Sequence, residues 1–104
     1  MVDKRFEQPN RTLTQSYINL INHIDIMIKE IDDEIDAHKK GVGNEGTEKQ
    51  LEIIKREIGK MKFILNSREF NPSYPRIIVD SWDYNSELAN KLLDIAEKYR
   101  KVTR

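Results

Sequence analysis

Apolar residues recur at alternating steps of three and four along this chain, and this spacing restricts the fold more than any other feature. The clearest run extends from Leu51 to Leu65 at steps of 3, 4, 3 and 4. At 3.6 residues per turn, residues with this spacing lie on one face of an α-helix. The pattern therefore predicts an all-α protein in which each helix buries one face.

Two further runs and the residues that flank them set the number of helices. The same spacing extends from Leu13 to Ile35 and from Leu88 to Val102. Thr12 and Thr47 each precede a glutamine by three residues, which is the spacing of a capping box at a helix start. Residues 41–46 contain three of the four glycines and end the first helix. We expect three helices, at about 13–39, 48–68 and 86–101.

Charge indicates how the first two helices pair. Residues 24–38 contain six acids and one base, whereas residues 47–68 contain six bases and three acids. A short turn makes consecutive helices antiparallel neighbours, so the acidic and basic stretches would lie side by side. We expect a long antiparallel helical hairpin with a third helix against it. This three-helix bundle would be a single domain of residues 12–104, after a flexible tail of residues 1–11.

Composition excludes several classes of protein. The chain has 104 residues, zero net charge and no cysteine, so we expect neither a disulfide framework nor a cysteine-based zinc site. Its first ten residues have no apolar run, which argues against a signal peptide. No stretch approaches the roughly 18 apolar residues of a membrane span. We expect a cytoplasmic protein with no membrane partner, and the Lys/Ile/Asn-rich usage indicates a bacterial or phage origin.

The acidic segment 29–38 raises the question of catalysis. Helical metal sites need carboxylates and histidines that converge from several helices. Glu34 and His38 are four residues apart, but the other two predicted helices offer no matching inward acid or histidine. We expect a solvated or salt-bridged face, with no catalytic residue, cofactor or metal. A small helical enzyme with an acidic site, including Asp32 and Asp36, is the least favoured alternative.

Basic residues suggest a second alternative, an accessory protein that binds nucleic acid. The predicted helix at 48–68 is net basic, and the C-terminal residues 98–104 add two lysines and two arginines. Clustered cations can hold phosphates. However, the basic helix is expected to face the acidic one, and no helix-turn-helix spacing is present. The sequence therefore does not favour nucleic acid as the partner.

Residues 70–85 differ from the rest of the chain, because they combine two prolines, the only tryptophan and several other aromatics. Pro72 and Pro75 bias the preceding residues to extended conformations. We expect an ordered aromatic and proline-rich loop, with a short extended run at 76–79. In one interpretation its apolar side chains close the open end of the bundle, namely Phe70, Ile77, Val79 and Trp82.

A second, compatible interpretation makes the same loop a recognition surface. Trp, Tyr and Arg are enriched at the energetic centres of protein interfaces, and prolines lower the entropy cost of ordering a loop. The candidate partner-binding residues are Phe70, Tyr74, Arg76, Trp82 and Tyr84. Apolar residues away from the main stripes suggest self-association as a homodimer. These are Ile18, Ile26, Phe63 and Leu93.

The function most consistent with these features is non-catalytic. We expect a small adaptor or regulator that binds one protein partner through the 70–85 loop and the adjacent helix faces. A narrower alternative is an inhibitor or immunity-type protein that blocks a partner enzyme.

Overall fold

The computed structural model describes the backbone of residues 2–83 and 85–103, and the side chains within 15–83 and 85–103. These residues form four α-helices and no strand: α1 (Val2–Lys39), α2 (Glu48–Phe63), α3 (Tyr74–Ser81) and α4 (Glu87–Thr103). The predicted all-α class is confirmed. The predicted number of helices is wrong, because residues 74–81 form a helix of their own.

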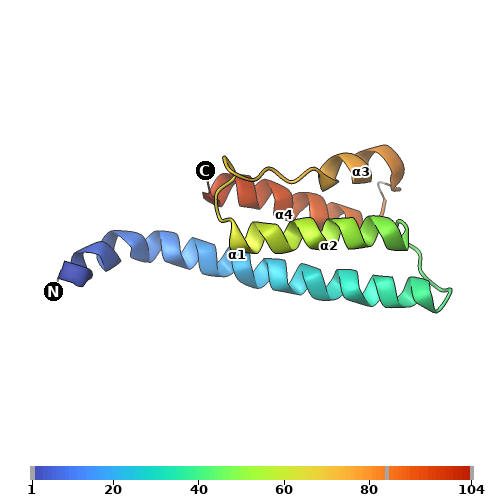
Figure 1. Cartoon of the computed structure of the whole chain (residues 1–104), viewed down its shortest axis with the longest axis horizontal. Coiled ribbons are helices and arrows are strands. Elements are labelled where there is room, and N and C mark those ends of the chain that lie inside the picture. Colours follow the sequence, from blue (N-terminus) through green and yellow to red (C-terminus); the bar gives the residue numbers. More distant parts are fainter. Residues whose placement is uncertain (1, 84, 104) are drawn as a thin grey trace.

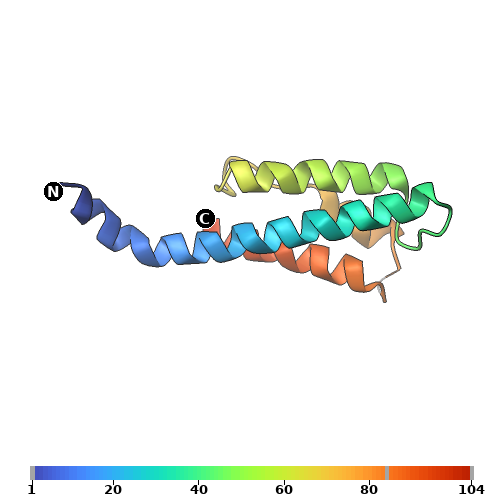
Figure 2. The same ribbon diagram turned by 90° about the horizontal axis from the view of Figure 1, so that it is seen from below.

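Helices α1 and α2 form the expected antiparallel hairpin, and α4 packs along α1 (Figures 1 and 2). Two ion pairs between α1 and α2 show how the two helices are aligned. Lys55 Nζ lies 2.7 Å from Asp32 Oδ1, and Lys62 Nζ lies 2.9 Å from Asp25 Oδ1. The acidic and basic stretches therefore do meet. Because these side chains are half exposed, each pair adds only about 0–1 kcal/mol, and their main effect is on alignment.

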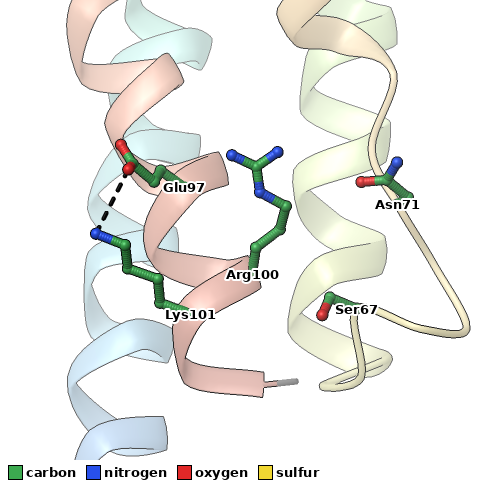
Figure 3. A pocket seen from close by; sticks show the side chains of 5 residues that line it. All are labelled: Ser67, Asn71, Glu97, Arg100 and Lys101. Carbon is green, nitrogen blue, oxygen red and sulfur yellow. Dashed lines mark ion pairs between the residues drawn. The ribbon is translucent and has the colours of Figure 1, made fainter.

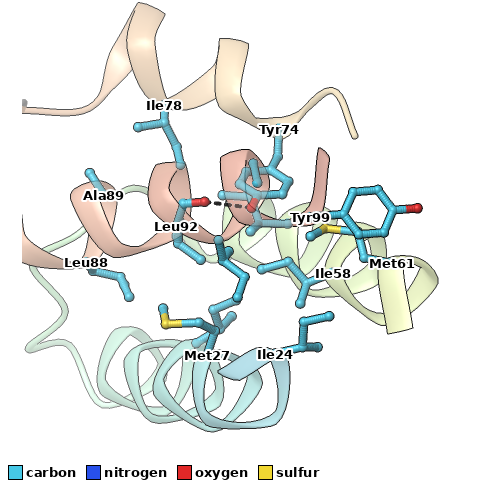
Figure 4. Close-up of a cluster of buried hydrophobic side chains, with 14 of the residues drawn as sticks. Ile24, Met27, Ile58, Met61, Tyr74, Ile78, Leu88, Ala89, Leu92 and Tyr99 are labelled. Atoms are coloured by element: carbon cyan, nitrogen blue, oxygen red, sulfur yellow. Dashed lines mark hydrogen bonds between the residues drawn. The ribbon is translucent and has the colours of Figure 1, made fainter. Parts of the chain in front are cut away.

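The core is one cluster to which all four helices contribute (Figure 4). From α1 and α2 it takes Leu20, Ile24, Met27, Ile31, Leu51, Ile54, Ile58 and Met61. From the second half of the chain it takes Tyr74, Ile78, Trp82, Leu88, Ala89, Leu92, Ile95, Ala96 and Tyr99. The predicted apolar stripes thus supply the buried faces of α1, α2 and α4, and α3 covers the core from a further side.

The ends of the first helix differ in how well they were predicted. Its C-terminus at Lys39 is as expected, but α1 begins at Val2 rather than near Leu13. The helix includes Pro9, whose missing amide hydrogen normally disfavours a helix interior. Its N-terminal part extends past the ends of the other helices (Figures 1 and 2). Flexibility of residues 1–11 in solution stays a prediction.

The second helix ends at Phe63, five residues before the predicted end, because the chain that follows forms hydrogen bonds with α4. The Tyr99 hydroxyl donates to the Ile64 carbonyl oxygen, and the Ser67 amide donates to Thr103 Oγ1 at 3.0 Å. These contacts take the place of continued helical hydrogen bonds. The α4 start was predicted correctly, and there Ser86 Oγ accepts from the Ala89 amide at 2.9 Å.

Candidate functional site

The aromatic segment contains α3 rather than the extended run expected at 76–79. Pro75 lies in the first helical turn, where its missing N–H is not needed. The cap comes from α2. Glu57 Oε1 accepts from the Ser73 and Tyr74 amides, both at 2.8 Å, and Glu57 Oε2 accepts from Ser73 Oγ at 2.6 Å. A carboxylate at the positive end of a helix is favourable, so a distant residue starts this helix.

Tyr74, proposed from the sequence as a surface residue, is completely buried. Its hydroxyl donates to the Leu92 carbonyl oxygen at 2.7 Å, so α3 is tied to α4 at the centre of the core (Figure 4). Burial, and secondarily the nearby Glu57 carboxylate, raises the pKa of Tyr74 far above its usual range. The surface position expected for this side chain is therefore wrong, because its ring completes the apolar core.

Trp82 is also a core residue, with 8% of its surface exposed. Its indole Nε1 donates to Gln50 Oε1 at 3.0 Å. The backbone of Gly46 lies against the ring, so close that a Cβ there would come within 2.3 Å of it. The interpretation in which the segment closes the bundle therefore holds for Trp82, and Phe70 and Ile77 are partly buried. It fails for Val79, which is 70% exposed.

The part of the aromatic segment that remains on the surface is small. Arg76 and Val79 are exposed on the outer side of α3, and Phe70 is half-buried with its ring 5.6 Å from Lys60 Nζ. Tyr84 lies outside the described residues. The five proposed partner-binding residues therefore do not form one surface, since two of them are in the core.

The residues proposed for self-association are dispersed as well. Leu93 packs against the core and is only partly exposed. Ile18 and Ile26 are exposed on α1, at 43% and 56%. Phe63 stands out at 87% exposed, in the last turn of α2. Of the large apolar side chains that the structure describes, Phe63 is therefore the one that offers most of its surface to solvent.

Gly59 lies one turn before Phe63 on the same outer side of α2. An added Cβ at Gly59 would meet nothing within 4 Å. Among the described residues, no other helix approaches this position closely. Glycine inside a helix costs about 1 kcal/mol relative to alanine, and no contact within the described chain compensates.

Two cationic residues, Arg56 and Lys60, lie on the same outer side of α2. Arg56 is exposed and has no ion-pair partner among the described residues, and the Lys60 ammonium lies above the Phe70 ring. We call the group Arg56, Gly59, Lys60 and Phe63 the outer face of α2. It combines a protruding aromatic ring, open space at the glycine and positive charge.

The acidic residues considered for catalysis have structural roles. Glu34 Oε2 accepts from the Asn44 and Glu45 amides at 2.7 and 2.8 Å, which ties the hairpin turn to α1. Asp32 pairs with Lys55 as described above, and Asp36 pairs with Lys40 at 3.4 Å. In the part of the chain that the structure describes, no group of three acidic or histidine side chains is arranged to hold a metal ion.

His23 lies where α1 meets α4. Its Nδ1 is 3.4 Å from Lys98 Nζ, so the neutral ring can accept a hydrogen bond from the ammonium. Partial burial, and then the Lys98 charge, lowers the pKa of His23, while Asp94 and Glu30 act weakly in the opposite direction. This pair is therefore a pH-sensitive contact between two helices.

Comparison with protein-family models, curated proteins and solved structures finds no match for this chain. Within the described residues, none of the helices combines the length and the apolar character that crossing a membrane requires.

Proposed function

We propose that this chain is a non-catalytic protein-binding module that contacts its partner through the outer face of α2. The observation that carries the proposal is the 87% exposure of Phe63 beside Gly59, at which an added Cβ would have no neighbour. A large aromatic side chain that inserts into a pocket of the partner is a typical hot spot of binding energy. A surface glycine lets a partner's side chain or backbone come closer than any other residue permits.

The energetics of the free chain support this choice. Exposing Phe63 forgoes the burial of an aromatic ring, and Gly59 weakens α2 without any benefit inside the described chain. Features that reduce the stability of the free chain are expected where function requires them. The flanking Arg56 and Lys60 favour a partner with acidic groups around its pocket. An adaptor and an inhibitor of one partner enzyme both fit this surface.

The proposal shifts the interface from the aromatic segment to an adjacent helix. Tyr74 and Trp82 support the core, so their part in the proposed function is to hold α3 and α2 in place. Arg76 and Val79 remain accessible on α3, and they define the competing surface that an experiment must separate from α2.

The test is affinity capture with the full chain as bait, from a lysate of the cells that produce it. Three baits are compared: wild type, Phe63→Ala and the matched control Val79→Ala, which trims a comparably exposed side chain on α3. Both substitutions lie on the surface and are expected to leave folding intact. The proposal predicts a stoichiometric protein that wild type and Val79→Ala retain and Phe63→Ala loses.

Two results would contradict the proposal. Loss with Val79→Ala and retention with Phe63→Ala would move the interface to α3. Absence of any stoichiometric protein with the wild-type bait would count against a protein-binding role altogether. A homodimer would appear as self-association of the purified wild-type chain that Phe63→Ala abolishes.

A further inference from the structure

A cleft of about 450 Å³ lies at the end of the bundle opposite the hairpin turn. It is formed between the last turns of α4 and the segment that follows α2. Its lining residues are Ser67, Asn71, Glu97, Arg100 and Lys101 (Figure 3). The cleft exists because α2 stops at Phe63 and the chain then runs past α4. The hydrogen bond from the Ser67 amide to the buried Thr103 side chain fixes one wall.

One cation in this cleft has no internal partner. Lys101 Nζ pairs with Glu97 Oε2 at 3.4 Å, one turn away on the same helix. Arg100 points away from that pair, into the space between α4 and the segment that carries Asn71 (Figure 3). No ion pair or hydrogen bond of its guanidinium occurs among the described residues. Its charge therefore faces the cleft uncompensated.

Three of the lining residues carry groups that can donate hydrogen bonds to an anion. Ser67 contributes a hydroxyl, Asn71 an amide and Arg100 a planar guanidinium. Guanidinium binds phosphate oxygens in a bidentate way, with two parallel N–H···O bonds. The only carboxylate in the lining, Glu97, is already engaged by Lys101. The chemistry of the lining thus suits a phosphate group better than a cation or an apolar ligand.

We infer that this cleft binds a phosphate monoester, with Arg100 as the anchor and with Ser67 and Asn71 as additional donors. The volume of about 450 Å³ falls in the range of small-molecule sites, which is roughly 300–1,000 Å³, so there is room for an organic group on the ester. This inference is independent of the protein-binding proposal, because the cleft shares no residue with the outer face of α2.

The competing explanation is that Arg100 only complements the negative C-terminal end of α4. Cations are favoured in a last helical turn, by about 0.3–1 kcal/mol. In that case replacing Arg100 would lower stability slightly and leave anion binding unchanged. Binding and stability therefore have to be measured on the same variants.

The experiment titrates the full chain with phenyl phosphate and, separately, with inorganic phosphate, by amide NMR shifts at constant ionic strength set with chloride. Arg100→Gln is compared with Arg76→Gln, which removes another exposed arginine on α3. The expected result is saturable binding with shifts at Ser67 and Asn71. Arg100→Gln should weaken it about tenfold or more, and Arg76→Gln should not change it.

The results distinguish an ester ligand from free phosphate and from the absence of a site. Tighter binding of phenyl phosphate than of the free ion supports an ester ligand, whereas equal affinity would assign the site to free phosphate and overturn the ester. Absence of saturation, or an equal loss with both arginine variants, would overturn the site. Asn71→Asp tests the cleft without altering Arg100, because a new carboxylate there should also weaken binding about tenfold. Unchanged affinity in that variant would contradict the inference.

Discussion

The indole Nε1 of Trp82 donates to Oε1 of Gln50 at 3.0 Å, and the same oxygen accepts from the Thr47 amide at 3.2 Å. Gln50 thereby serves both the capping box of α2 and the end of α3. Its Nε2 also donates to Ser81 Oγ at 3.1 Å. One side chain thus couples the start of one helix to the end of another.

Replacing Gln50 by alanine should therefore cost more than the loss of a surface glutamine. The variant leaves the partly buried indole N–H without its acceptor and removes one half of the capping box. We expect the free energy of unfolding to fall by about 1–3 kcal/mol. Chemical denaturation followed by the fluorescence of Trp82 measures it. Gln15→Ala is the control, because among the described residues that side chain hydrogen-bonds to Asn19 within α1. An equal effect of the two variants would refute the coupling.

Gly46 and Gly41 offer a matched pair of substitutions in the hairpin turn. Both have positive φ, +60° and +82°, so alanine at either position introduces backbone strain of about 1 kcal/mol. Only at Gly46 would the new Cβ also collide with the Trp82 ring. We expect Gly46→Ala to lower Tm more than Gly41→Ala and to change the emission of Trp82. Equal Tm values would show that the ring moves aside freely.

Gly59→Ala should stabilise the free chain. Its φ is not positive, and the added methyl group would meet nothing within 4 Å, so only the gain in helix propensity remains. We expect about 1 kcal/mol more stability, or roughly 5 °C in Tm. Thermal unfolding followed by circular dichroism measures this shift. A decrease in Tm would mean that another part of the chain approaches Gly59 after all.

Protonation of His23 should lower the free energy of unfolding as pH falls, because its pKa is lowered in the folded chain. Burial and Lys98 lower the folded-state pKa of His23 below its ordinary value of 6.5, so the unfolded chain takes up a proton first as pH falls. The contribution of the neutral ring is complete above pH 6.5 and is lost as pH falls through the lowered folded-state pKa. His23→Gln should therefore show a smaller loss of stability between about pH 7.5 and pH 5.5. Parallel curves for the two proteins would contradict this assignment.

Much of the fold follows from local patterns, because helix registers depend on residues three and four apart. The buried faces of α2 and α4 coincide with the runs from Leu51 and from Leu88, and the capping box at Thr47 forms as predicted. The α2 end was missed because its determinants, Tyr99 and Thr103, are 35 and 36 residues away from the groups they bind. No local pattern in the sequence could reveal those contacts.

The aromatic segment shows the same limit. Pro72 and Pro75 predict extended chain at the residues before them, but proline also suits a first helical turn. The Glu57 carboxylate that caps α3 lies 17 residues before Tyr74. Residue type predicts a binding surface at Tyr74 and leaves Trp82 open between that surface and the core, whereas the structure buries both side chains. Phe63 was noticed from the sequence because it lies off the apolar stripe. That the space beside Gly59 is open became apparent only when all helices were placed.

The most direct test of the account is the affinity of the captured partner for Gly59→Ala and Phe63→Ala, measured against wild type by isothermal titration calorimetry. The account predicts that Phe63→Ala weakens binding about thirtyfold or more. It also predicts that Gly59→Ala weakens binding although it stabilises the chain, because the methyl group occupies space that only a partner could use. Wild-type affinity in both variants would contradict the claim that the outer face of α2 is the interface.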